Sequence, residues 1–133
     1  MVSERNPQRS RVYLELRRLH SPDTEDLRSP DLEDPENFCL LVQALVGPRS
    51  ERGEESFSFL VCTPRWLADH LRANRPLFAR HHLFVNRYDY DAIRGRIEEL
   101  CSTTSGHNWT EAAERLARYG SWEFEDYHPY EGS

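Results

Sequence analysis

Residues 38–67 read FCLLVQALVGPRSERGEESFSFLVCTPRWL, and this stretch decides the fold. Its first ten residues are almost all apolar, with one polar break at Gln43, which favours a strand at the centre of a sheet. A polar turn segment, 48–55, separates it from the run 56–63, whose alternation puts Phe57, Phe59 and Val61 on one face. A third alternating run lies at 12–19, so we expect three strands in an antiparallel meander.

The period of the pattern changes to that of a helix at TPRWLADHLRAN, residues 63–74. Thr63 followed by Pro64 predicts a helix start, because proline lacks the N–H that would be unpaired there. The apolar face of this helix carries Trp66 and His70. We expect Trp66 to anchor the helix on the sheet and His70 to be a packed, hydrogen-bonded core residue.

The rest of the chain completes an α+β pattern. We expect a strand at 80–88, a helix capped by Asp89 or Asp91, a helix from Asn108 with Glu111 at capping-box spacing, a left-handed stop at Gly120 and a final strand over 121–127. The predicted order is βββαβααβ, a mainly antiparallel sheet with about three helices. The 133 residues suit one domain, over 12–127, with a disordered leader at 1–11 and a tail at 128–133.

A long acidic loop is predicted between the first two strands, in SPDTEDLRSPDLEDPEN at 21–37. Each of its three prolines disfavours helix at the preceding residue. Loops of this length are uncommon in small domains unless they carry function. Function and disorder are both open for this segment.

Charge and composition limit the classes of partner. The net charge is −6, and residues 23–55 hold ten acids against three arginines. Nucleic-acid binding is disfavoured because phosphate contacts need clustered cations, whereas the acidity favours a basic partner or solubility alone. No apolar run reaches the roughly 20 residues that span a bilayer, and no signal peptide is visible. We therefore expect a cytoplasmic protein without a membrane partner.

No motif for catalysis or metal binding is found. The three cysteines, at 39, 62 and 101, have no metal-ligand spacing and suit buried hydrophobes or free thiols in a reducing compartment. The six histidines form no HExxH pair, and the adjacent His81 and His82 would point to opposite faces of a strand. Cys62 or Ser56 with one of these histidines is the available nucleophile pair, but neither lies in a recognisable elbow. We predict no catalytic residue, metal or cofactor.

A family resemblance is carried by segments along most of the chain. They are SPD at 21–23, DPENFCLLVQALVGP at 34–48, GEESFSFLVCTPRWL at 53–67, RHHLFVNRYDYDAI at 80–93 and GHNWTEAAERLARYGSWEFEDY at 106–127. Over residues 12–127 the chain resembles the immunity protein family 8 of bacterial polymorphic toxin systems. The resemblance implies a small cytoplasmic α+β protein that neutralises a secreted toxin, often a nuclease, by binding it. It implies no catalytic residues.

Two acidic surfaces are candidates for binding such a toxin. One is the acidic loop, with Asp31, Glu33 and Asp34. The other is the last strand, where alternation would point Trp122 and Phe124 inward and the side chains of Glu123, Glu125 and Tyr127 outward. The loop could equally be a solvated linker, and acids on an edge strand also discourage aggregation.

Three hypotheses follow. The first is a stoichiometric inhibitor of a cognate, basic, secreted toxin, with affinity from a few buried aromatic or Arg side chains. The second is a small hydrolase that uses Cys62 and a histidine. The third is a self-associating scaffold domain. The sequence leaves the oligomeric state and the identity of the toxin open.

Overall fold

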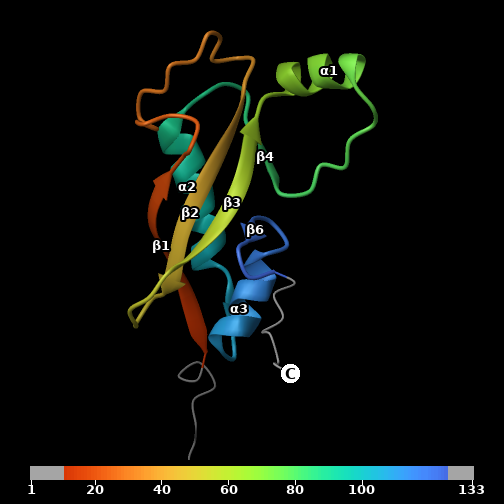
Figure 1. The fold of residues 1–133 in the computed structure, drawn as a ribbon. Helices are drawn as coiled ribbons and strands as arrows, with labels where there is room; N and C mark the ends of the chain where they lie inside the picture. The colour runs from red at the N-terminus through yellow and green to blue at the C-terminus, as the bar shows by residue number, and fades with distance from the viewer. Residues whose placement is uncertain (1–10, 126–133) are drawn as a thin grey trace, which may run out of the picture.

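Three long antiparallel strands form the centre of the fold. The computed structural model describes residues 11–125, in which β1 (Val12–His20), β2 (Cys39–Pro48) and β3 (Glu55–Cys62) pair in chain order. The meander predicted from the sequence is therefore confirmed, and Figure 1 shows it as one curved sheet. The register of β1 shifts between Leu16 and Arg18, an irregularity that bends and twists a strand.

Short strands extend the sheet at both edges. β5 (Ser105–Gly106) pairs with β1, whereas β4 (His82–Phe84) and β6 (Ser121–Trp122) both pair with β3. β4 runs parallel to the end of β3, and β6 runs antiparallel to its beginning. The predicted order βββαβααβ is confirmed, with β5 as an additional two-residue strand, and the strand predicted at 80–88 is reduced to three residues.

The three predicted helices are α1 (Pro64–Ala73), α2 (Tyr90–Ser102) and α3 (Trp109–Leu116). Each begins where a side-chain oxygen accepts a backbone N–H of the first turn. These capping residues are Thr63, Asp89 and Asn108. Glu111 donates its N–H to the Asn108 side chain at 2.8 Å, and its own carboxylate accepts the N–H of His107, the residue before the cap, in place of the Asn108 N–H that a capping box uses.

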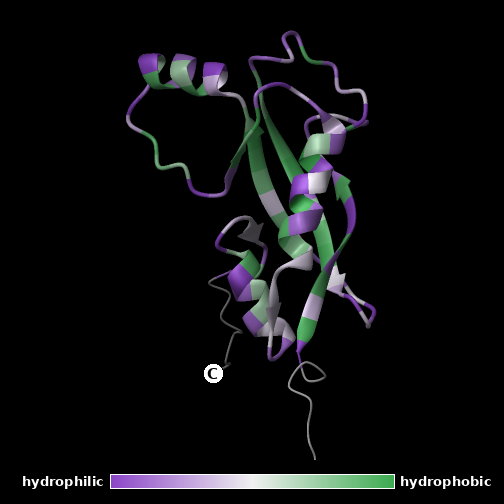
Figure 2. Cartoon of the chain, turned by 180° about the vertical axis from the view of Figure 1, so that it is seen from behind, coloured by the Kyte–Doolittle hydropathy of each residue, from purple (hydrophilic) through white to green (hydrophobic). Residues whose placement is uncertain are grey.

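The hydrophobic core lies between the sheet and two helices. α2 is behind the sheet in Figure 1 and in front of it in Figure 2. Alternate residues of the three long strands face α2 and α3 and are buried with the apolar stripes of both helices. The buried residues include Leu14, Leu40, Val42, Phe57, Phe59, Val61, Ile93, Ile97, Ala113 and Leu116. The α+β prediction is confirmed.

The opposite face of the sheet is more open. Leu41, Leu45 and Leu60 lie on it and are half-buried, and their neighbours include Gln43 and Ser58. Within residues 11–125, no helix lies over this face (Figure 1). The central strands therefore have one buried and one partly solvated face, which differs from the fully covered strand that the apolar run predicts.

A glycine is needed at position 120, after α3, but not for the predicted left-handed turn. Positive φ is found at Gly53, with 103°, and not at Gly120. A Cβ at Gly120 would instead meet the ring of Phe59 at 2.6 Å. Phe59 is buried in the core, so this glycine is required for the close approach of the chain to an aromatic ring.

Candidate partner-binding surfaces

The acidic loop between β1 and β2 is held against the body of the protein. Leu27 is buried, and its carbonyl accepts a hydrogen bond from the hydroxyl of Tyr88. The N–H of Tyr88 donates to the carbonyl of Pro35 at 2.8 Å. Leu32 also packs against the core. The loop is thus a packed part of the domain with defined side-chain positions.

A depression of about 500 Å³ lies at the start of this loop. Four carboxylates line it, from Asp23, Glu25, Asp26 and Asp31. Asp23 accepts the N–H of Leu41 and Asp26 accepts a backbone N–H within the loop, but none of the four forms an ion pair with a cation of the described chain. We call these four residues the acidic depression. The sequence prediction named Asp31 and missed the other three, although all lie in the same acidic run.

Glu33 and Asp34 lie further along the loop and have different surroundings. Asp34 is 3.4 Å from the guanidinium of Arg65 and accepts the N–H of Glu36 at 2.9 Å. Its carboxylate therefore links the loop to the start of α1. Glu33 is exposed, and no hydrogen bond or ion pair connects it to the rest of residues 11–125.

The last strand presents its acids differently from the prediction. Only Ser121 and Trp122 pair with β3, and the chain then turns, so the expected alternation ends at Trp122. Phe124, predicted to be in the core, is 40% exposed and lies edge-on to Trp122. Tyr127 lies outside the described residues.

The carboxylates of Glu123 and Glu125, at the end of the described chain, both interact with other residues of the protein. Glu123 accepts the N–H of Ser56 at 2.5 Å. Glu125 pairs with Arg80 at 2.5 Å, and its side chain is only 23% exposed. Glu123 therefore holds the end of the chain on β3, whereas Glu125 joins it to Arg80, which offsets the charge of its carboxylate.

The two acidic surfaces lie at opposite ends of β3. β6 pairs at Phe57 and Ser58, near the start of the strand, whereas the acidic loop leads into β2 opposite Cys62 at the strand's end. Figure 1 shows the loop and β6 well separated along the sheet. The residues predicted for partner binding therefore do not form one patch.

A third surface, which the sequence prediction missed, is an arm formed by residues 64–81. α1 projects from the end of β3 (Figure 1), and none of its residues is buried. The arm exposes Leu71, Leu77 and Phe78, the last of which is 95% exposed. Exposed apolar surface is typical of interaction sites where it is contiguous, whereas single exposed apolar side chains are common on any protein.

The expected anchoring of α1 to the sheet is wrong. Trp66 stacks on His70 of the same helix, with ring centroids 4.7 Å apart, and neither side chain is in the core. The contacts of α1 are with the acidic loop, through Arg65 and a hydrogen bond of 3.0 Å from Asn37 to Asp69. An amphipathic stripe predicts that a face should be covered, but it does not identify what covers it.

In the described chain, no hydrogen bond joins the residues proposed for a hydrolase. His81 and His82 place ring nitrogens 3.0 Å and 2.9 Å from the carbonyl oxygens of Ala117 and Arg80. Cys62 is fully buried and lies opposite Cys39 of β2. In the described part of the chain, no group of three or more His, Cys, Asp or Glu residues could hold a metal ion.

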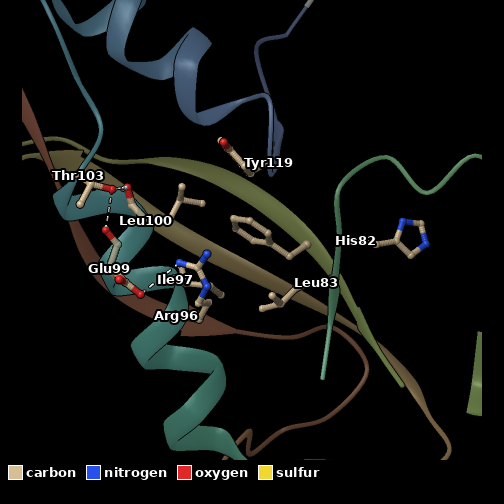
Figure 3. Close-up of a pocket in the computed structure, with 9 residues that line it drawn as sticks. His82, Leu83, Arg96, Ile97, Glu99, Leu100, Thr103 and Tyr119 are labelled. Carbon is tan, nitrogen blue, oxygen red and sulfur yellow. Dashed lines mark hydrogen bonds and ion pairs between the residues drawn. The ribbon is translucent and has the colours of Figure 1, made fainter. Parts of the chain in front are cut away.

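A cavity of about 370 Å³ opens between α2, β4 and the turn after α3. Figure 3 shows its apolar side chains, including Ile97 and Leu83, facing one another, while His82 points away. Arg96 pairs with Glu99 at 3.2 Å, and Thr103 donates to backbone carbonyls of α2. Its lining holds no Cys or Ser nucleophile of the kind that the hydrolase hypothesis requires.

Tyr88 provides a test of how the acidic loop is held. Burial raises the pKa of Tyr88 to about 12, with smaller contributions from Tyr90 and Asp26. The folded state thus favours the neutral phenol, and this stabilisation is present below about pH 10 and is lost as the pH rises from 10 towards 12. We expect Tyr88→Phe to cost about 1 kcal/mol at neutral pH, through the lost hydrogen bond. It should also flatten the alkaline loss of stability.

Denaturant titrations between pH 7 and pH 11 measure both effects. Tyr119→Phe is the control, since Tyr119 is exposed, and it should match the wild-type protein at neutral pH. An alkaline loss in Tyr88→Phe that is as steep as in the wild type would contradict this role.

Residues 14–127 match the family described as Immunity protein 8, and this match covers most of the chain. No curated protein and no solved structure matches the sequence. Among residues 11–125, no helix has the length and apolar character needed to cross a bilayer.

Proposed function

Because the chain belongs to the Immunity protein 8 family, we propose that it neutralises the toxin encoded beside it in a bacterial polymorphic toxin system. Neutralisation occurs in the cytoplasm by stoichiometric binding, and the chain itself performs no catalysis. The toxin presents a basic surface, and a nuclease is the class that fits best because a nuclease must bind phosphates with cations.

The acidic depression is the surface that we propose for toxin binding, together with the neighbouring Glu33. The observation that supports this choice is that the four carboxylates of the depression form no ion pair within the described chain. Carboxylates without a cationic partner project their field into solvent and steer a basic protein towards them. By contrast, Asp34 and Glu125 already have arginine partners.

The test removes charge without disturbing the fold. In Glu25→Gln with Asp31→Asn, both side chains are exposed, so folding should be unchanged. We expect the association rate with the purified toxin domain to fall about tenfold or more at low salt, and its salt dependence to weaken. Stopped-flow fluorescence measures both.

A matched control removes the same charge elsewhere. Glu98→Gln with Glu114→Gln changes two exposed acids on α2 and α3, and should leave the association rate close to that of the wild type. Equal effects of the two double variants would indicate that net charge, and not the acidic depression, steers the toxin. No binding by the wild-type chain would contradict the proposed function itself.

Toxin contact by the end of the chain is a separate prediction. If Glu123, Glu125 and Tyr127 contact the toxin, changing all three together should abolish protection of cells while the domain stays folded. Normal protection by this triple variant would exclude the end of the chain from the interface. Circular dichroism is the control for folding, because Glu123 and Glu125 both make contacts within the domain.

Self-association is a second candidate function, and the exposed arm favours it. Leu71, Leu77 and Phe78 present apolar surface that a second copy could cover. Light scattering with and without toxin distinguishes a monomer from a dimer. A monomeric mass at high protein concentration would exclude this candidate.

A further inference from the structure

Two of the three cysteines lie directly opposite each other on neighbouring strands. Cys39, at the start of β2, is the register partner of Cys62, at the end of β3. The adjacent pair, Phe38 and Thr63, is joined by a backbone hydrogen bond of 3.2 Å. Hydrogen-bonded and non-hydrogen-bonded pairs alternate along antiparallel strands, so the cysteines occupy a non-hydrogen-bonded pair. Such pairs have Cα atoms about 4.5 Å apart, within the range that a disulfide spans.

The side chains of the two cysteines already interact. The neighbouring Cys62 side chain lowers the pKa of Cys39. The Cys39 side chain, together with burial, raises the pKa of Cys62. Cys39 is partly exposed, whereas Cys62 is buried. A reagent from solvent therefore reaches the Cys39 sulfur, whose lowered pKa favours the reactive thiolate form. The third cysteine differs, since burial raises the pKa of Cys101 to about 12 and this residue lies on α2.

We propose that Cys39 and Cys62 form a reversible dithiol–disulfide site that is oxidised by low-molecular-weight disulfides. The Cys39 thiolate attacks the disulfide, forms a mixed disulfide and releases one small thiolate. The Cys62 sulfur then attacks the Cys39 sulfur, the bond to the small thiol breaks, and the proton of Cys62 passes through water to the departing thiolate. In total two protein thiols are oxidised, and one small disulfide is reduced to two thiols.

The position of this site gives the bond a structural consequence. The acidic loop enters β2 at Cys39, and α1 begins two residues after Cys62. The disulfide would therefore join the base of the acidic loop to the base of the arm. It closes a loop that contains the whole β2–β3 hairpin, and such closure restricts the unfolded chain. The inference concerns thiol chemistry and does not depend on the proposed function.

The experiment uses the reduced full chain and oxidised glutathione at mildly alkaline pH. After an acid quench, the protein is unfolded, alkylated with N-ethylmaleimide and weighed by mass spectrometry. We expect the wild-type protein to lose two of its three alkylation sites, to carry no glutathione and to yield a cross-linked 39–62 peptide after digestion. Dithiothreitol should restore all three sites.

Two variants provide the controls. Cys101→Ser should still form the bond and leave no alkylation site, whereas Cys62→Ser should retain glutathione on Cys39 because the second thiol is missing. Three alkylated cysteines in the treated wild type, or a stable glutathione adduct on it, would overturn the proposal. So would a cross-link that includes Cys101. The wild-type result stands on its own if Cys62→Ser fails to fold.

Discussion

Phe57→Ala is expected to lower the free energy of unfolding by about 3–5 kcal/mol, the largest effect of any single change considered. The Phe57 side chain has no exposed surface. Its ring stacks on Trp122, with centroids 6.1 Å apart and planes 6° from parallel. Removing it opens a cavity in the core and takes away the surface on which β6 rests.

Guanidinium denaturation followed by circular dichroism measures this change. Phe57→Leu keeps most of the volume and should cost clearly less than the alanine variant. Phe78→Ala removes an aromatic ring that is 95% exposed, so its stability should lie within about 0.5 kcal/mol of the wild type. A cost for Phe57→Ala no greater than that of Phe78→Ala would refute the assignment of this ring to the core.

Glu55→Ala is expected to cost about 2 kcal/mol. One carboxylate oxygen of Glu55 accepts the indole N–H groups of Trp109 at 3.0 Å and of Trp122 at 2.8 Å. The first of these residues begins α3 and the second lies in β6. Removing the acceptor leaves two half-buried donors without their partner, and α3 and β6 lose the side chain that joins both of them to the start of β3.

The conservative variant tests whether the acceptor or the charge matters. Glu55→Gln keeps a side-chain oxygen and should retain much of the stability. Glu54→Ala removes the neighbouring acid, whose partner is the exposed Arg18, and should have little effect. If Glu55→Gln unfolds as readily as Glu55→Ala, the two indole hydrogen bonds are not what Glu55 contributes.

The parts of the fold that could be predicted depend on local patterns. Apolar runs and alternation predicted β1, β2 and β3, and the capping residues Thr63 and Asn108 predicted where α1 and α3 begin. These signals work because periodicity and capping act within a few residues of the chain. Long-range pairing was harder, as the two-residue strand β5 shows, since nothing local distinguishes Ser105 and Gly106 from a turn.

The candidate surfaces were predicted less completely, for a related reason. Alternation beyond Trp122 assumed that the last strand continues, but the chain turns and Glu125 reaches Arg80, which is remote in sequence. Counting acids selected the loop as a candidate region, yet it could not separate Asp34, which pairs with Arg65, from Asp31, which has no such partner in the described chain. Whether a charge is available to a partner depends on which arginines the fold brings near it.

The arm has a consequence for how the protein opens. Because no residue of α1 is buried, the helix shares little of the cooperative stability of the core. Helices shorter than about 12–15 residues are marginal on their own in water, and α1 has ten, so its order depends on the Thr63 cap and the contacts with the acidic loop. Its amide protons therefore exchange through local fraying while the sheet stays intact. A molecule that covers α1 would slow that exchange without changing the core.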